Sequence, residues 1–165
     1  MKVLDLEAAK QKAFRLLALR PHSEKELEKK LREKGFPAVV IKETLEKLHD
    51  LKYLNDESFA NQWTRNLAVN KLWGNKKIIA SLREKGLSAE LIASSIEKAR
   101  EELPEEAAIE ILIKKKAAKR KTSALDFKEK QKIFQTLMGR GFPPSLILNK
   151  LGRMKKEDID GEDWE

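Results

Sequence analysis

The pentapeptide LREKG occurs at residues 31–35 and again, letter for letter, at residues 82–86, and a looser copy, LMGRG, occupies residues 137–141. Each copy is followed by an apolar residue, then by Pro or Ser, and then by apolar residues at helical spacing. A sequence unit that recurs at an interval of roughly 50 residues is typical of proteins built from tandem structural repeats. The chain is therefore predicted to consist of three related units.

The residues around each copy predict helices. In the first unit, an apolar stripe over residues 5–20 ends at Pro21, and Ser23 with Glu26 forms a capping box at the start of a second helix. Pro37 suits the first turn of a third helix, because its missing N–H costs little there. The second helix of each unit is expected to end in a glycine with left-handed backbone conformation. These structural turn residues are Gly35, Gly86 and Gly141.

We therefore predict an all-α fold of about nine helices, arranged as three tandem three-helix repeats. The expected limits of the repeats are residues 1–53, 54–103 and 104–156, and an acidic tail at residues 157–165 is expected to be disordered. A three-helix unit is too small to bury much surface alone, so neighbouring repeats must stack. Such a serial stack predicts an elongated, curved body with a concave face.

Several residues of the second and third repeats give more specific expectations. Phe59 and Trp63 lie four residues apart in an apolar stripe and are predicted core residues. Trp73, beside a glycine at a helix junction, fits either the core or a contact surface. Asn75 is predicted to cap the fifth helix, and Asp126 to begin a second capping box.

The composition favours an acidic or polyanionic partner. Charged residues make up 38% of the chain, the formal net charge is +8, and only 6% of the residues are aromatic. This excess of positive charge suits a polyanion or an acidic protein surface, although a helical protein with many exposed Lys and Glu side chains would also show it. The chain contains no cysteine, its first residues do not resemble a signal peptide, and no apolar run approaches the roughly 20 residues of a membrane helix. A cytoplasmic protein without a membrane segment is therefore expected.

The residues that usually carry catalysis are sparse. The two histidines, His22 and His49, show no metal-ligand spacing, and both are expected to be surface residues at helix ends. There is no phosphate-binding loop and no thiol, and most acidic residues alternate with lysines along helices. Carboxylate pairs remain possible from sequence alone. The prediction is a protein that is not an enzyme and has no cofactor and no metal.

The joint between the second and third helix of each repeat resembles the turn of a helix-turn-helix motif. A recognition helix needs Arg, Asn or Gln side chains that reach base edges. The helices after the turns instead carry Glu43 and Glu46 in the first repeat and Glu90 and Glu97 in the second. Base-specific reading of DNA is therefore kept only as an alternative.

The densest positive charge lies at residues 114–121, in the run Lys114, Lys115, Lys116, Lys119, Arg120 and Lys121. A functional interpretation is contact with nucleic-acid phosphates, which would be independent of sequence and sensitive to salt. The alternative is an exposed helix end, where the helix dipole favours cations.

Several stretches resemble the RecX family of bacterial recombination regulators. They are LNDESFA at residues 54–60, the upstream set Leu16, Leu17, Arg20, Ser23, Glu26 and Leu27, Gly74 followed by basic residues and Ile78, and Arg140-Gly141-Phe142 with Ile147. The similarity covers about residues 8–152, and the order and spacing of the stretches make it specific. Gly139, where a charged residue is expected, and the acidic tail depart from the family pattern.

The resemblance implies three tandem three-helix repeats and a regulatory role without catalysis. Family members bind the RecA recombinase filament along its groove and mostly inhibit its ATPase, strand-exchange and co-protease activities. They also bind single- and double-stranded DNA weakly, and a monomer is expected. Whether regulation by this chain is inhibitory or stimulatory is left open.

Contact with the filament or with DNA would fall to basic residues. The candidates are Arg20, Arg32, Arg65, Lys71, Lys76, Lys77, Arg83, Lys114, Lys115, Lys116, Lys119, Arg120 and Lys121. Arg32 and Arg83 occupy equivalent repeat positions and could instead hold helices together through the neighbouring Glu33 or Glu84. The competing hypotheses are a sequence-independent nucleic-acid-binding helical module, a helix-turn-helix DNA-binding protein, and a helical scaffold for another partner.

Overall fold

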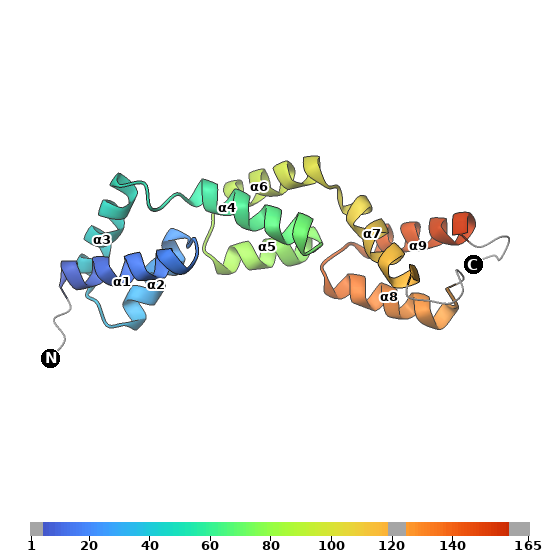
Figure 1. The fold of residues 1–165 in the computed structure, drawn as a ribbon, viewed down its shortest axis with the longest axis horizontal. Coiled ribbons are helices and arrows are strands. Elements are labelled where there is room, and N and C mark those ends of the chain that lie inside the picture. Colours follow the sequence, from blue (N-terminus) through green and yellow to red (C-terminus); the bar gives the residue numbers. More distant parts are fainter. Residues whose placement is uncertain (1–4, 119–124, 159–165) are drawn as a thin grey trace. The chain divides into compact units, whose positions relative to one another are not determined.

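The computed structural model describes residues 5–118 and 125–158, and within these residues every regular element is helical. The α-helices are α1 (Leu6–Leu19), α2 (Glu24–Glu33), α3 (Ala38–Asp50), α4 (Asp56–Arg65), α5 (Asn75–Glu84), α6 (Ala89–Glu102), α7 (Glu105–Ala118), α8 (Phe127–Gly139) and α9 (Pro144–Asp158) (Figure 1). One π-helix, η1, spans Asn66–Asn70. The predicted all-α fold is confirmed for this part of the chain.

The described residues pack as two compact units. The first contains residues 1–63 and 82–95, and the second contains residues 64–81 and 96–165, each taken over its described part. These units are defined by contacts and do not test the predicted limits of the three sequence repeats, which stay a prediction.

In the first unit, local signals set the helix ends. The Asp5 carboxylate accepts a hydrogen bond from the Ala8 N–H at 2.9 Å and begins α1. The predicted capping box of Ser23 and Glu26 is present at the start of α2. Gly35 follows α2 with a φ of 90°, as predicted. Pro37 stands at the N-cap of α3 with extended backbone, one residue before the helix and not in its first turn.

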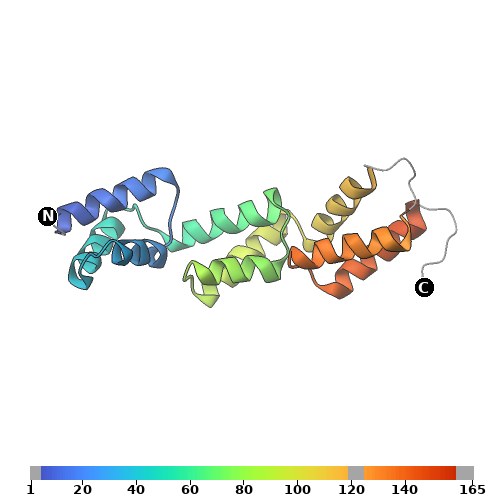
Figure 2. The same ribbon diagram turned by 90° about the horizontal axis from the view of Figure 1, so that it is seen from below.

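Helices α1, α2 and α3 pack against one another around an apolar core (Figures 1 and 2). The core consists of Ala9, Ala13, Leu27, Leu31, Phe36, Ile41, Leu45, Leu48 and Leu54. Burial of these side chains supplies the main driving force for this part of the fold.

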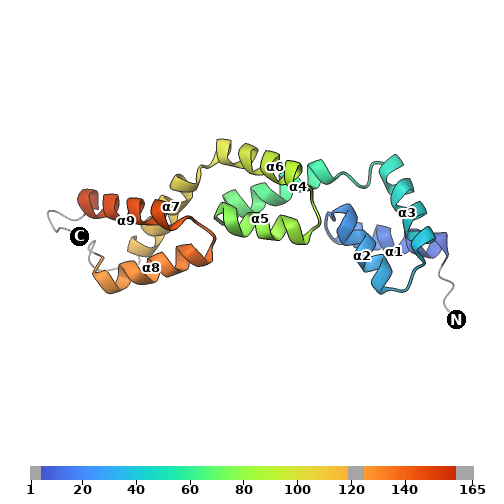
Figure 3. The same cartoon turned by 180° about the vertical axis from the view of Figure 1, so that it is seen from behind.

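In the second unit, α7, α8 and α9 pack against one another (Figure 3) and bury a separate apolar core. Its buried residues are Leu72, Ala108, Ile109, Ile113, Leu125, Ile133, Leu137, Phe142, Ile147 and Leu151. The predicted capping box at Asp126 is present, with Glu129 as its partner. Helix α9 extends to Asp158, so it includes the first residues of the predicted acidic tail, and the rest of that tail lies outside the described residues.

The segment between α4 and α5 departs from the sequence-based expectation. The chain widens from α4 into the π-helix η1, and Leu72 then adopts a left-handed φ of 56° although it is not glycine. Asn75 does not cap α5 as predicted: it is the first residue of the helix itself, and its side-chain oxygen accepts a hydrogen bond from Arg100 Nε at 2.8 Å. Irregular backbone of this kind is frequent where a protein positions functional side chains.

Candidate partner and nucleic-acid interface

The candidate basic residues fall into sets with different surroundings. Some form ion pairs within the protein, some gather around Trp73, and some extend into solvent. The contacts of each set decide whether its charge is available to a partner.

In the first unit, the start of α2 meets the turn that follows α5, and we call this contact the first junction. Glu26 accepts hydrogen bonds there from Arg20, with Nη1 at 3.2 Å, and from Lys85 Nζ at 2.8 Å. Ser23 Oγ donates to the carbonyl oxygen of Lys85 at 2.5 Å. The cations of Arg20 and Lys85 lie 5.5 and 5.0 Å from the centre of the Trp63 ring. Arg20 is therefore engaged in holding the unit together.

The aromatic prediction for this junction is only partly correct. Phe59 is buried, and Trp63 stacks on it with the ring centres 5.6 Å apart. Trp63 itself is only partly buried, because its ring also meets the two cations. The residue therefore joins the apolar core to the ion-pair network.

Glu26 has the most strongly shifted pKa in the first junction. Burial alone would raise the pKa of its carboxyl group, but hydrogen bonds from Arg20 and Lys85 outweigh this effect and lower the pKa to about 2. Glu26 is therefore ionised at all physiological pH values and its single negative charge lies between the two cations.

His22 does not lie on the surface, in contrast to the sequence-based prediction. Only 4% of the residue is exposed, its Nδ1 lies 2.9 Å from the Arg20 carbonyl oxygen, and its Nε2 lies 2.8 Å from Lys30 Nζ. Since the lysine can only donate, Nε2 accepts and Nδ1 carries the proton. Burial, and then the charges of Arg20 and Lys30, lower the pKa of His22, against a backbone hydrogen bond and Glu26. His49 is exposed in the last turn of α3, as predicted.

Two further candidate arginines are paired on the surface. Arg32 pairs with Glu28 one turn earlier on α2, and not with the neighbouring Glu33. Arg65 donates two hydrogen bonds to Glu102, at 2.8 and 2.6 Å, and these bonds raise the pKa of Arg65. Exposed pairs of this kind add little stability and can exchange for another anion.

The other candidates extend into solvent. Arg83 is exposed in the last turn of α5, and Lys114, Lys115 and Lys116 are exposed on α7. The remaining members of the basic run, Lys119, Arg120 and Lys121, lie outside the described residues. Their predicted contact with phosphates stays a prediction.

Two of the candidates, Lys71 and Lys77, come together in the second unit around Trp73, at a contact that we call the second junction. Lys77 Nζ lies 4.0 Å and Lys71 Nζ 5.8 Å from the centre of the Trp73 ring. Arg140 Nη1 donates to the carbonyl oxygen of Lys71 at 2.6 Å, and the Lys76 side chain is exposed nearby in sequence. Trp73 is partly buried, so the choice between core and contact surface stays open for this residue.

Backbone hydrogen bonds fix the second junction. The Gly74 and Lys76 N–H groups at the start of α5 donate to the carbonyl oxygens of Arg140 and Gly141, at 2.7 and 3.2 Å. These partners satisfy donors and acceptors that helix ends otherwise leave unmatched. The two glycines approach so closely that a Cβ on Gly74 would lie 2.3 Å from the Gly141 carbonyl carbon. The position of Gly74 therefore requires glycine.

Arg100 holds the segment between η1 and α5 through hydrogen bonds to Trp73 and Asn75. Its Nη2 donates to the Trp73 carbonyl oxygen at 2.8 Å, and burial lowers its pKa, while Glu105 and Glu106 oppose that shift. Arg100 and Arg140 were not among the predicted contact residues. The signal for Arg140 lies in the repeat itself, because Lys85-Gly86 aligns with Arg140-Gly141.

Over the described residues, no group of acidic residues and histidines could hold a metal ion. The helices of the described part also include none that is long and apolar enough to cross a membrane.

These observations define a class of protein built from tandem three-helix repeats, with exposed cations on several helices. Models of the RecX family match the chain in order: the first three-helix domain at residues 9–48, the second at residues 55–96 and the third at residues 104–151. The chain belongs to the RecX family.

Individual relatives agree with this assignment. The regulatory protein RecX of Pelodictyon phaeoclathratiforme is 36% identical over 130 residues, which cover 79% of this chain and 78% of that protein. The regulatory protein RecX of Geobacillus kaustophilus is 37% identical over 145 residues, or 87% of this chain and 52% of the relative. The chain spans about half the length of several of the curated relatives that it matches. Their shared name supports a regulatory role of the RecX type.

A solved structure supports the fold. The crystal structure of RecX from Lactobacillus salivarius superposes with a TM-score of 0.75 at 24% identity, and the match covers 92% of this chain and 97% of that one.

Proposed function

We propose that this protein binds the RecA recombinase filament along its groove and mostly inhibits ATP hydrolysis, strand exchange and co-protease activity. The observation that carries the proposal is the ordered match of three RecX three-helix domains over residues 9–151. Regulation would occur by binding, without catalysis by this protein. We further propose that the protein is a cytoplasmic monomer and that it binds single- and double-stranded DNA weakly.

The mechanism follows from how binding shifts a conformational equilibrium. Three tandem repeats in one chain could contact adjacent recombinase subunits at once and favour one spacing between them. A preference of a few kcal/mol for a filament state unable to turn over ATP would shift most of the population to that state. The exposed cations Arg83, Lys114, Lys115 and Lys116 would supply contacts to acidic surfaces.

The surroundings of the other candidates set their proposed roles. Arg20 is tied to a carboxylate in a partly buried network, so we assign it to the stability of the protein. Arg32 and Arg65 are paired but exposed, and would contribute only by exchanging partners. The lysines near Trp73 are considered separately below.

The proposal is tested by the ATPase activity of RecA on single-stranded DNA. Addition of this protein is expected to slow ATP hydrolysis at substoichiometric amounts, because one bound molecule would act on several filament subunits. A matched comparison is the variant in which Lys114, Lys115 and Lys116 are replaced by Ala. No inhibition by the wild-type protein over a wide concentration range would contradict the proposed function.

Two alternatives make different predictions. A general nucleic-acid-binding module would bind bare DNA tightly with a steep salt dependence and would need no recombinase.

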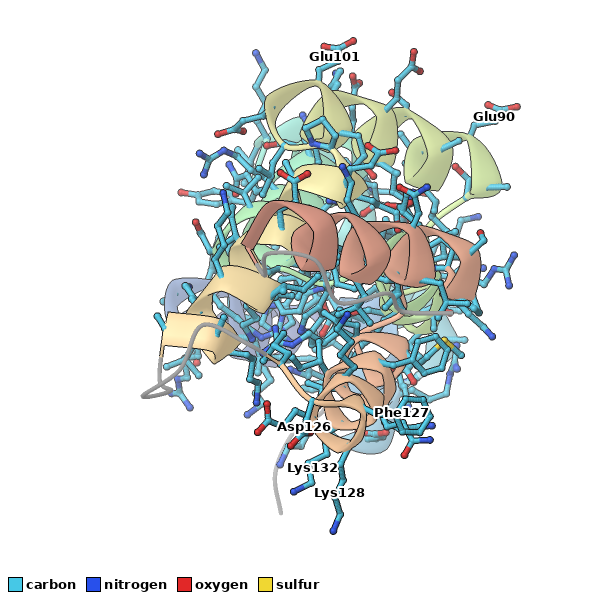
Figure 4. The ribbon with its side chains drawn as sticks, turned by 90° about the vertical axis from the view of Figure 1, so that its right-hand side faces the viewer. Glu90, Glu101, Asp126, Phe127, Lys128 and Lys132 are labelled. Carbon is cyan, nitrogen blue, oxygen red and sulfur yellow. The ribbon has the colours of Figure 1, made fainter. Side chains whose placement is uncertain are left out.

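A helix-turn-helix protein would use α6 for base recognition, yet Glu90 projects from that helix and Glu97 is also exposed on it (Figure 4). Carboxylates on a recognition helix oppose the DNA backbone, so this alternative is disfavoured.

A further inference from the structure

The two junctions occupy equivalent positions in the repeat. An offset of 51 residues takes Leu31 to Leu82, and the same offset takes Arg20 to Lys71, Ser23 to Gly74 and Glu26 to Lys77. The turn residue Lys85 aligns with Arg140 in the next repeat at an offset of 55 residues. In both junctions a donor before the second helix of one repeat donates a hydrogen bond to the carbonyl oxygen of this turn residue in the next repeat. The donor is Ser23 Oγ in the first junction and the Gly74 N–H in the second.

The charges at these equivalent positions differ in one decisive way. In the first junction, Glu26 lies between Arg20 and Lys85 and pairs with both. In the second junction, the position of the glutamate is occupied by Lys77. Among the described residues, no carboxylate forms an ion pair with Lys71, Lys77 or Arg140.

The cations of the second junction therefore have no ion-pair partner among the described residues, and the carboxylate held in this segment, that of Glu105, accepts a hydrogen bond from the Asn75 N–H at 3.1 Å. Two of its cations lie near one indole ring, and Arg140 is tied to the backbone of Lys71. Arg100 does not add to this excess, because Glu105 and Glu106 oppose its charge. Like charges held close together repel one another, so a junction of this composition favours an anion from outside.

We propose that the second junction is a binding site for single-stranded nucleic acid, with Lys71, Lys76, Lys77 and Arg140 on the phosphates and Trp73 against a base. Phosphate oxygens accept hydrogen bonds from lysine and arginine, and a partly exposed indole offers a surface on which any base can stack. The site rests on the proposed function, because it gives the regulator a contact with the DNA strand of the filament.

The backbone of the segment suits this role. The π-helix η1 and the left-handed Leu72 shape the backbone at Lys71 and Trp73, whose side chains meet with the Lys71 Nζ 5.8 Å from the centre of the Trp73 ring. The close contact of Gly74 with Gly141 then fixes Arg140 beside them. The cations and the ring are thus held in position before any ligand binds, which lowers the entropic cost of binding.

The test exploits the difference between the two junctions. Lys77→Glu gives the second junction the charge arrangement of the first, and Lys132→Glu makes the same change of charge on α8, where Lys132 projects into solvent (Figure 4). Binding of fluorescein-labelled oligothymidine to the full chain is measured by fluorescence anisotropy over a range of salt concentrations, without recombinase. Thermal unfolding of each variant is recorded in parallel.

Lys77→Glu is expected to weaken binding at low salt by about tenfold or more and to reduce the slope of log K against log salt by roughly one to two. The same variant should keep its melting temperature or raise it by about 2–4 °C, because the new carboxylate can pair with Lys71 and Arg140. Lys132→Glu should change the affinity by less than about threefold.

Several outcomes would overturn the proposal: no binding by the wild-type chain, equal losses in the two variants, or a duplex that binds as tightly as the single strand. If Lys77→Glu proves less stable than the wild type, Lys71→Ala gives the decisive affinity, and an unchanged value again refutes the site. Loss of RecA inhibition in Lys77→Glu without loss of DNA affinity would assign the junction to an acidic protein surface instead. Inhibition of RecA by a wild-type protein that binds no DNA would refute this site alone and leave the proposed function standing.

Discussion

Replacement of Glu26 by Gln tests whether the ion-pair network of the first junction stabilises the protein. The pKa of the carboxyl group falls from 4.5 to about 2 in the folded state, and each unit corresponds to about 1.4 kcal/mol. The ionised carboxylate therefore contributes about 3 kcal/mol at neutral pH, and with only 10% of the side chain exposed, solvent screens little of this. Since glutamine keeps the shape and one acceptor oxygen, we expect Glu26→Gln to lower the free energy of unfolding by about 2–3 kcal/mol.

The pH dependence of this difference identifies its origin. Because the folded-state pKa of Glu26 is depressed, its contribution is fully present above about pH 4.5 and is lost as the pH falls through about 2. Near pH 3 the calculated contribution is about 1.4 kcal/mol. Urea unfolding of wild type and variant at neutral pH and at several acidic pH values should therefore show two stabilities that converge with acidification.

Glu28→Gln provides the control, because it removes an acid from the same helix whose partner, Arg32, is 66% exposed. Its cost should stay below about 1 kcal/mol. A Glu26→Gln penalty that is no larger than this, or that does not change between neutral and acidic pH, would refute the assignment of stability to the charge of Glu26.

Three further predictions concern other local features; the first is checked by NMR titration and the others by chemical denaturation. The folded-state pKa of His22 is lowered, so its neutral form stabilises the protein above about pH 6.5. This stability is lost as the pH falls below that value. An NMR titration midpoint of His22 at or above 6.5 would contradict this prediction. Gly74→Ala should cost about 2–3 kcal/mol, since its Cβ would overlap backbone, whereas Gly139→Ala, with open space around the added atom, should stabilise α8 by about 0.5–1 kcal/mol. Lys52→Gly should stabilise by about 0.5–1 kcal/mol, because Lys52 has a φ of 62°; no gain would show that this residue makes a compensating contact.

The features that the sequence predicts correctly depend on neighbours along the chain. The capping box of Ser23 and Glu26 and the left-handed Gly35 each involve residues within one or two helical turns. The apolar stripes that bury Leu27 and Leu31 follow from helical periodicity in the same way. Helix positions and the repeat plan can therefore be read with no knowledge of tertiary contacts.

The features that the sequence does not predict depend on partners far along the chain. Lys85 reaches Glu26 across 59 residues, so the pairing of Arg20 and Glu26 into one network could not be read from spacing. His22 is buried with its Nε2 2.8 Å from Lys30 Nζ, a contact between two segments that the apolar periodicity does not predict. The sequence analysis also did not predict the π-helix η1, which buries Leu67 and Ala68.

Comparison of the repeats with one another recovers part of this missing information. Once the first junction is known to need an anion between Arg20 and Lys85, the aligned Lys77 marks the second junction as different in kind, although its backbone contacts follow the same plan. The same backbone contact thus recurs with the opposite charge at its centre. The reversal of charge at Lys77 therefore separates a junction that is satisfied within the protein from one whose charges are left for a ligand.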